Sequence, residues 1–201
     1  MLHRLRSFVL IFPASLFAFV ACGCRVDPDA SWRQRTEGQL ADIRSGERHT
    51  VFCPYPGMLL GLAEEPNVAM NLTEVRSWGD VSSPDFAHLA DLPKLESVSL
   101  YDAHGVDAFL KHLLACKAII RISVDQTDLS DAGLATIGQM STLRDVPIGA
   151  WDDRISAEGL NQLASLKTLR KLWLRVGPST PNLDAIRSAL PDCDIRLEVE
   201  E

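Results

Sequence analysis

Few residues of this chain combine the types and the spacing that catalysis requires. Asp152 and Asp153 follow Trp151, and adjacent carboxylates could ligate a cation or serve as an acid and a base. Neighbours in sequence usually point apart, however, and no third ligand is evident, so we favour a solvated acidic turn. The four histidines after residue 48 share no metal-binding or catalytic spacing. There is also no Gly-rich phosphate loop, nucleophile elbow or His/Cys cluster. We predict no catalytic residue, no metal and no cofactor, with an enzyme site between His49 and Trp78 as the alternative.

Trp173 has the surroundings that best fit a binding role. It lies between Lys171 and Arg175 in a chain with 20 Lys+Arg against 27 Asp+Glu. An exposed tryptophan flanked by cations is typical of an interface anchor. The structural alternative is that Trp173 packs against a neighbouring unit and shields the end of the molecule.

The tryptophan belongs to a pattern that returns about every 24 residues. Leu95-x-x-Val98-x-Leu100 recurs with its first residue at Ile119, Leu143 and Leu169. A fixed period of this length is typical of a solenoid, whose units bury their apolar sides against one another. The leucine-type residues should point inward and the residues between them outward. From the outward set we select these candidates for partner binding: Trp173, Lys171, Arg175, Arg121 and Tyr101.

Each strand-like segment is followed by a polar turn and an apolar triplet at helical spacing, such as Leu134, Ile137 and Met140. Ser130 and Ser156 are predicted N-caps of two of these helices. We predict degenerate N-terminal repeats or a cap over residues 48–94, with the recognisable repeat starting near Asn67. Clear repeats fill residues 95–201 and end in a closing strand.

The stretches 127–134 and 155–160 (Thr-Asp-Leu-Ser-Asp-Ala-Gly-Leu and Ile-Ser-Ala-Glu-Gly-Leu) resemble the turns of the bacterial leucine-rich-repeat family with ribonuclease-inhibitor-like units. The resemblance implies an α/β solenoid with short parallel strands on the concave side and helices on the convex side. It also implies a protein or peptide ligand on the concave sheet. Many such repeats carry Asn or Cys after the strand to hold the turn. Here those positions are Ala103, Thr127, Trp151 and Gly177, so the turn bonds must be made otherwise.

The N-terminal segment has the composition of an export signal. Arg4 and Arg6 precede an apolar run that ends at Ala21, and this run is shorter than the roughly 20 residues of a membrane span. We predict a signal peptide over residues 1–21; the alternative is an uncleaved anchor helix. Phe-Val-Ala-Cys-Gly-Cys at 19–24 resembles a lipobox, which predicts lipidation at Cys22 or Cys24. The alternative is an ordinary signal peptide that is cut nearby and leaves one or two free or disulfide-bonded thiols.

Residues 25–47 are polar and predict a tether with one or two helical turns; a disordered N-terminus without a role is the alternative. Without Arg4 and Arg6 the chain has 18 basic against 27 acidic residues, which argues against a nucleic-acid partner. The remaining cysteines, Cys53, Cys116 and Cys193, share no metal-type spacing, and buried thiols fit them better than disulfides.

Together these patterns predict a non-catalytic, exported leucine-rich-repeat protein. We expect it to be anchored by an N-terminal lipid to the periplasmic or surface face of a cell-envelope membrane. Its concave sheet would bind a protein or peptide whose identity the sequence does not give. The alternative function is a structural spacer of the envelope without a discrete ligand.

Overall fold

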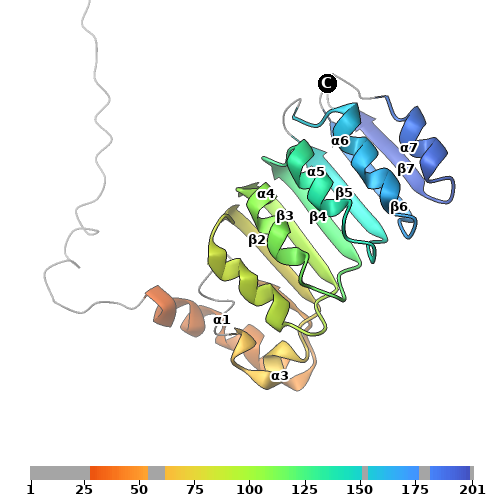
Figure 1. The fold of residues 1–201 in the computed structure, drawn as a ribbon. Helices are drawn as coiled ribbons and strands as arrows, with labels where there is room; N and C mark the ends of the chain where they lie inside the picture. Colours follow the sequence, from red (N-terminus) through yellow and green to blue (C-terminus); the bar gives the residue numbers. More distant parts are fainter. Residues whose placement is uncertain (1–27, 54–61, 151–153, 177–181, 200–201) are drawn as a thin grey trace, which may run out of the picture.

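A seven-stranded parallel sheet organises the molecule (Figure 1). The computed structural model describes residues 28–53, 62–150, 154–176 and 182–199. Every strand pairs with the next strand along the chain, in the order β1 to β7. The strands are β1 Thr50–Phe52, β2 Glu74–Asp80, β3 Ser97–His104, β4 Arg121–Thr127, β5 Asp145–Ala150, β6 Lys171–Val176 and β7 Asp194–Val199. The fold class is therefore mixed α/β, as expected, with one continuous parallel sheet.

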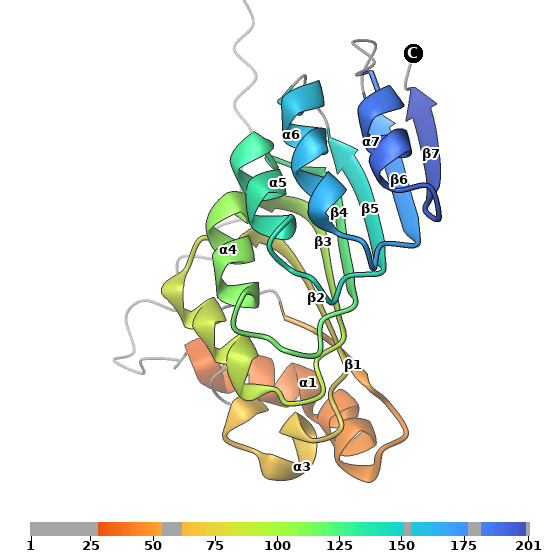
Figure 2. The same cartoon turned by 45° about the vertical axis from the view of Figure 1, so that its right-hand side comes forward.

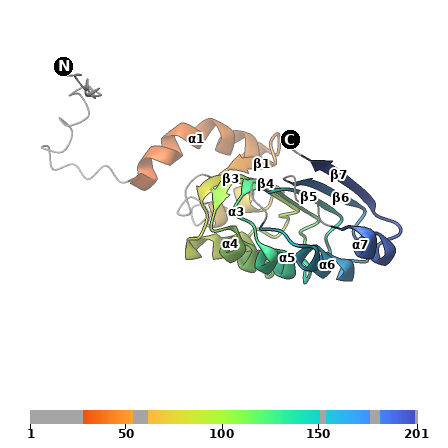
Figure 3. The same ribbon diagram turned by 90° about the horizontal axis from the view of Figure 1, so that it is seen from above.

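Helices cover one face of this sheet (Figure 3). They follow the strands in alternation: the 3-10 helix η2 Pro84–Asp91, α4 Val106–Leu113, α5 Asp131–Ile137, α6 Ala157–Asn161 with its 3-10 extension η3 Gln162–Ser165, and α7 Asp184–Ala189. In Figures 1 and 3, α4 to α7 lie side by side on the same side of the strands. We call the opposite face of the strands the open face.

The core lies between the sheet and the helices. Val98 of β3 pairs in register with Ile122 of β4, and Leu100 with Val124, so that inward side chains of neighbouring strands stack in rows. All four are at most 1% exposed. Helical side chains close the layer from the other side; Phe86 and Phe109 meet edge to face with ring centroids 4.9 Å apart. Alternation along each strand thus sends one set of residues into the core and the other set onto the open face.

The N-terminal part is more ordered than the sequence suggested. Helix α1 spans Pro28–Ser45, where we expected a tether with one or two helical turns, and it lies with α3 (Pro66–Ala69) at the β1 end of the sheet (Figure 2). Leu40 and Ile43 of α1 are 1% and 0% exposed, so the end of this helix belongs to the core. Strand β1 extends the sheet back to Thr50, within residues 48–94 where degenerate repeats or a cap were expected. Within the described residues, no helix is both long and apolar enough to cross a membrane.

Aspartates of one helix hold the start of the next, in place of the asparagine ladder that the sequence lacks. Asp107 accepts hydrogen bonds from the backbone N–H and the hydroxyl of Ser130, at 3.1 and 2.5 Å. Asp131 does the same for Ser156, at 2.9 and 2.6 Å. Both serines cap their helices as predicted, accepting from backbone N–H groups at 3.2 Å (Ser130) and 3.1 Å (Ser156).

Glycines make room for these aspartates. A Cβ at Gly133 would overlap Asp107 Oδ1, and a Cβ at Gly159 would overlap Asp131 Oδ1. The Ser-x-x-Gly spacing that carries the family resemblance therefore has a local physical cause: the serine donates to the aspartate, and the glycine leaves space for it.

Candidate functional site

The open face presents three rows of outward side chains, each row crossing the strands. The first row follows the strand register from β1 to β7 and consists of Thr50, Glu74, Ser97, Arg121, Asp145, Lys171 and Asp194. The second contains Phe52, Arg76, Ser99, Ser123, Pro147, Trp173 and Arg196. The third contains Tyr101, Asp125, Gly149, Arg175 and Glu198, with Trp78 of β2 beside Tyr101. Aromatic side chains lie towards both ends of this surface, and charged side chains are distributed along all of it.

The N-terminal hollow lies over β1 to β4 and has a volume of about 630 Å³. Its apolar lining comes from Phe52, Trp78 and Tyr101, which are 39%, 44% and 55% exposed. The rings of Phe52 and Trp78 are tilted against each other with centroids 5.8 Å apart, and the Arg76 guanidinium lies 5.7 Å from the Phe52 centroid. Aromatic rings exposed together in a concave surface are suited to bury an apolar or aromatic group of a partner.

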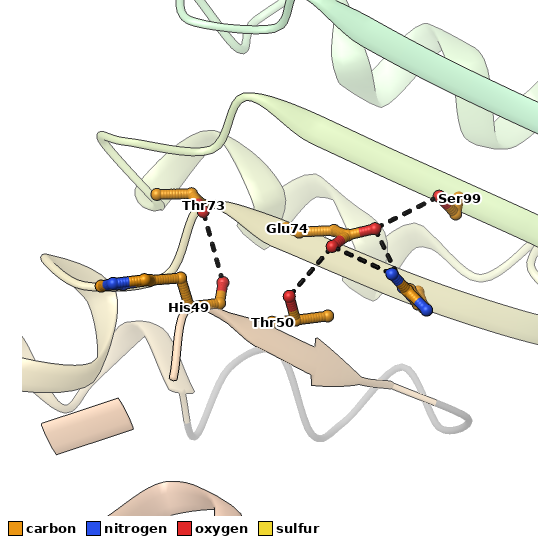
Figure 4. Close-up of polar contacts among 6 residues, drawn as sticks. His49, Thr50, Thr73, Glu74 and Ser99 are labelled. Carbon is orange, nitrogen blue, oxygen red and sulfur yellow. Dashed lines mark hydrogen bonds and ion pairs between the residues drawn. The ribbon is translucent and has the colours of Figure 1, made fainter. Parts of the chain in front are cut away.

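Glu74 fixes the polar floor of this hollow (Figure 4). Its carboxylate accepts hydrogen bonds from Thr50 Oγ1 at 2.9 Å, from Arg76 Nε at 2.9 Å and from Ser99 Oγ at 3.5 Å. Partial burial raises the pKa of Glu74, but the hydrogen bonds from Arg76 and Thr50, together with the positive charges of Arg76 and Arg121, outweigh burial and leave this pKa below its ordinary value. The carboxylate therefore stays charged at neutral pH and holds Arg76 against Phe52.

The C-terminal hollow surrounds Trp173 on β5 to β7 and has a volume of about 260 Å³. Trp173 is 43% exposed, and the Arg175 guanidinium lies 5.7 Å from its ring centroid. Lys171 is exposed at the same hollow and forms no ion pair with any residue that the structure describes. Trp173 therefore makes a cation–π contact with Arg175 while a large part of its side chain remains exposed.

Two of the five candidate residues are engaged within the chain. Arg121 forms an ion pair with Asp145 of the next strand. Arg175 of β6 reaches over β5 to Asp125 of β4, so this pair links strands that are not neighbours. Gly149 lies between the two charges, and a Cβ there would overlap Asp125 Oδ1. Arg121 lines both hollows and Asp145 lines the C-terminal one. We call the four residues of these two ion pairs, Arg121, Asp145, Asp125 and Arg175, the central saddle.

All five candidates lie on the open face, as the alternation predicted, but they do not form one cluster. Tyr101 lines the N-terminal hollow, Trp173 and Lys171 line the C-terminal one, and Arg121 lines both. Sequence reasoning missed Phe52, Trp78 and the Glu74–Arg76 pair, because the repeat is degenerate before Leu95. The available signal was the alternation through β2, in which Glu74, Arg76 and Trp78 share one face.

The other candidates for chemistry are not gathered into a metal-binding site in the part of the chain that is described. Over residues 28–53, 62–150, 154–176 and 182–199, no group of three His, Cys, Asp or Glu side chains is arranged to hold a metal ion. His49 Nδ1 lies 2.8 Å from the Asn71 carbonyl oxygen. Burial raises the pKa of the Cys116 thiol to about 11, which keeps it protonated and unreactive at neutral pH. Trp151, Asp152, Asp153, Cys22 and Cys24 lie outside the described residues.

Comparison with known proteins assigns no family. No family model matches the chain, and no curated protein matches it. Among solved structures the chain is similar to the plant peptide hormone receptor RGFR1 in complex with RGF2, with a TM-score of 0.36 and 9% sequence identity. The likeness covers 75% of this chain and 31% of that receptor chain, so this protein spans under a third of the receptor's length. At this level of similarity the comparison decides neither family nor function.

Proposed function

We propose that this chain is a leucine-rich-repeat solenoid that binds a protein or peptide segment across the open face of its sheet, without catalysing a reaction. The repeat of about 24 residues, the strand order that follows the chain, and the helices gathered on one face support the repeat architecture. Export and an N-terminal lipid at Cys22 or Cys24 belong to the same proposal, supported by the composition of residues 1–24.

The observation that carries the proposal is the contrast between the open face and the whole chain. The three rows hold five basic and five acidic residues, whereas the chain has a net charge of −7: Arg76, Arg121, Lys171, Arg175 and Arg196 against Glu74, Asp125, Asp145, Asp194 and Glu198. The same face exposes four large aromatic side chains. Neutrality combined with exposed Trp, Tyr and Arg is the composition of a protein-binding surface.

The two hollows define a ligand with two anchor points. Tyr101 and Trp173 lie on β3 and β6, three strand spacings apart, which is about 14 Å measured across the strands at about 4.8 Å per strand. An extended peptide covers that distance in about four residues at roughly 3.4 Å per residue. The ligand segment would place apolar or aromatic side chains about four residues apart, one in each hollow, with polar backbone above the central saddle.

The central saddle would position the ligand and select against ligands that carry a charged group at this point. Its ion pairs are already satisfied within the chain, so a ligand need not neutralise them. Burying an unpaired charge is costly, and a saddle of paired charges avoids that cost when the ligand covers it. A ligand with a charged group at this point would have to displace one partner of a pair, which would select against it.

The test is selection of a phage-displayed library of random peptides against the purified chain. Enriched peptides should carry two apolar or aromatic residues about four positions apart. Trp173→Ala and Trp78→Ala should each weaken binding of the selected peptides about thirtyfold, as expected for anchors that contribute about 2 kcal/mol. Leu114→Ala is the matched control, because Leu114 is 39% exposed but follows α4 outside both hollows.

Two results would contradict the proposal. One is that no peptide is enriched over an unrelated acidic protein. The other is that the selected peptides bind the Trp173→Ala and Trp78→Ala variants as tightly as the parent chain. Either result would favour the spacer role, in which the repeats have no discrete ligand.

A further inference from the structure

The C-terminal edge of the sheet is unpaired in the described part of the chain. Strand β7 is the last strand in the order, and Figure 2 shows it at the border of the sheet. The Asp194 N–H donates to the Arg170 carbonyl at 2.8 Å. The backbone N–H and C=O groups of Asp194, Arg196 and Glu198 therefore face β6. The backbone N–H and C=O groups of Ile195, Leu197 and Val199 point away from the sheet. A row of unpaired N–H and C=O groups is a template for another strand.

The two ends of the core differ in how they are closed. At the β1 end, α1 and α3 close the core, with Leu40 and Ile43 fully buried. At the β7 end, Ile195 and Leu197 are only partly buried and Val199 is 43% exposed. These three side chains lie on the helix-covered side of β7, since Ile195 and Leu197 are in register with the core residues Leu172 and Leu174. The C-terminal edge therefore offers apolar side chains together with free backbone groups.

We propose that a second copy of this chain docks on this edge, β7 against β7, in antiparallel orientation. The register is centred on Leu197, which lies opposite Leu197 of the second copy. Ile195 then lies opposite Val199 of the other chain, and the same contact occurs again by symmetry. The backbone groups of Ile195, Leu197 and Val199 point away from the sheet, so these residues form the hydrogen-bonded pairs between the two β7 strands.

Charge disfavours the neighbouring register centred on Arg196. Opposite residues of an antiparallel pair share one face of the sheet, so Arg196 lies against Glu198 of the second copy, twice by symmetry. A register centred one residue earlier, on Arg196, would place Arg196 against itself and Asp194 against Glu198. Arg196 now pairs with Asp194 at 2.8 Å, but the two side chains are 75% and 50% exposed, and such a pair is readily rearranged.

The dimer would join the two seven-stranded sheets into one. Its two-fold axis runs through the sheet, so both helix layers lie on one side and both open faces on the other. The exposed parts of Ile195, Leu197 and Val199 would be buried against their counterparts. The arrangement uses the edge of the sheet and leaves both hollows accessible, so it does not depend on what the open face binds.

The test is sedimentation equilibrium of the full-length chain in a density-matched detergent. The parent chain should sediment as a dimer. Arg196→Glu and Glu198→Arg should each weaken the dimer at least about tenfold, because each brings like charges together at both symmetric contacts. The double variant Arg196→Glu/Glu198→Arg should recover the dimer, because it restores the opposite-charge pairs in exchanged positions.

Lys111→Glu is the control for a change of charge alone; Lys111 is exposed on α4, away from the edge, and this variant should dimerise like the parent chain. Circular dichroism identifies any variant that fails to fold, and recovery in the double variant excludes misfolding as the cause of dissociation. A monomeric parent chain at all concentrations overturns the proposal. So does a pair of single variants that dimerise as tightly as the parent, or a double variant that stays monomeric.

Discussion

The missing side chain of Gly149 allows two charged neighbours to meet. Arg175 reaches across β5 to Asp125, and a Cβ at position 149 would overlap the Asp125 carboxylate and lie 3.4 Å from Arg175 Nη2. Gly149→Ala should separate the pair or displace β5. We expect the free energy of unfolding, measured by urea denaturation, to fall by about 1–3 kcal/mol, the usual cost of inserting a methyl group into a filled space.

Gly38→Ala is the matched control for this substitution. Gly38 lies in α1, and no atom would come within 4 Å of an added Cβ. This variant should be as stable as the parent chain or more stable by up to about 1 kcal/mol, because alanine favours a helix. If Gly149→Ala unfolds at the same urea concentration as the parent, the pair tolerates the methyl group and the explanation is wrong. In an Asp125→Ala background most of the loss should disappear.

At the scale of elements, the bonds between successive helices are the feature most open to test. Asp131→Ala would leave the N–H and hydroxyl of Ser156 without their acceptors at the start of α6. We expect the free energy of unfolding to fall by about 1–3 kcal/mol, the cost of a partly buried donor that loses its partner. Asp184→Ala is the control, because Asp184 is also in the first turn of a helix but is exposed.

Asp184→Ala should lose only the favourable position of a carboxylate at a helix N-terminus, about 0.3–1 kcal/mol. Equal losses in the Asp131→Ala and Asp184→Ala variants would mean that the contact with Ser156 contributes nothing beyond that effect. A further check is hydrogen exchange at the Ser156 amide, which should accelerate in Asp131→Ala alone.

The elements predicted best from sequence were those with an intact period. Leu95, Val98 and Leu100 repeat with little change, and the strands and helices that follow them lie where the period placed them. Helix α1 was underestimated because few of its residues are apolar, so the burial of Leu40 and Ile43 gave only a short signal. Its position depends on tertiary contact with α3, which no local pattern records.

The candidate site was predictable only in part. Alternation placed Trp173 and Tyr101 on the open face, because the direction of a side chain follows from the pleat alone. It could not show that Arg175 is paired with Asp125, since the two residues are 50 positions apart and on strands that do not touch. Phe52 and Trp78 escaped notice because their strands precede the regular repeats, although together they form the larger hollow.

At the scale of the whole molecule, the proposed lipid would give the sheet an orientation. Helix α1 begins at Pro28, four residues after Cys24, a distance of at most about 14 Å in an extended chain. Since α1 and α3 lie at the β1 end, that end would be nearest the membrane and β7 farthest from it (Figure 2). The unpaired edge would then be directed away from the lipid, where a second copy could reach it.

The anchor itself can be tested by replacing both candidate cysteines. Cys22→Ser/Cys24→Ser should move the protein from the membrane fraction to the soluble fraction of lysed cells, because stable anchoring depends on more than one acyl chain and serine accepts none by this route. Cys116→Ser/Cys193→Ser is the control; both thiols belong to the folded body, and this variant should remain with membranes. If the first variant also stays on membranes, the lipid is not the anchor, and the apolar segment before Ala21 would be retained as an uncleaved helix.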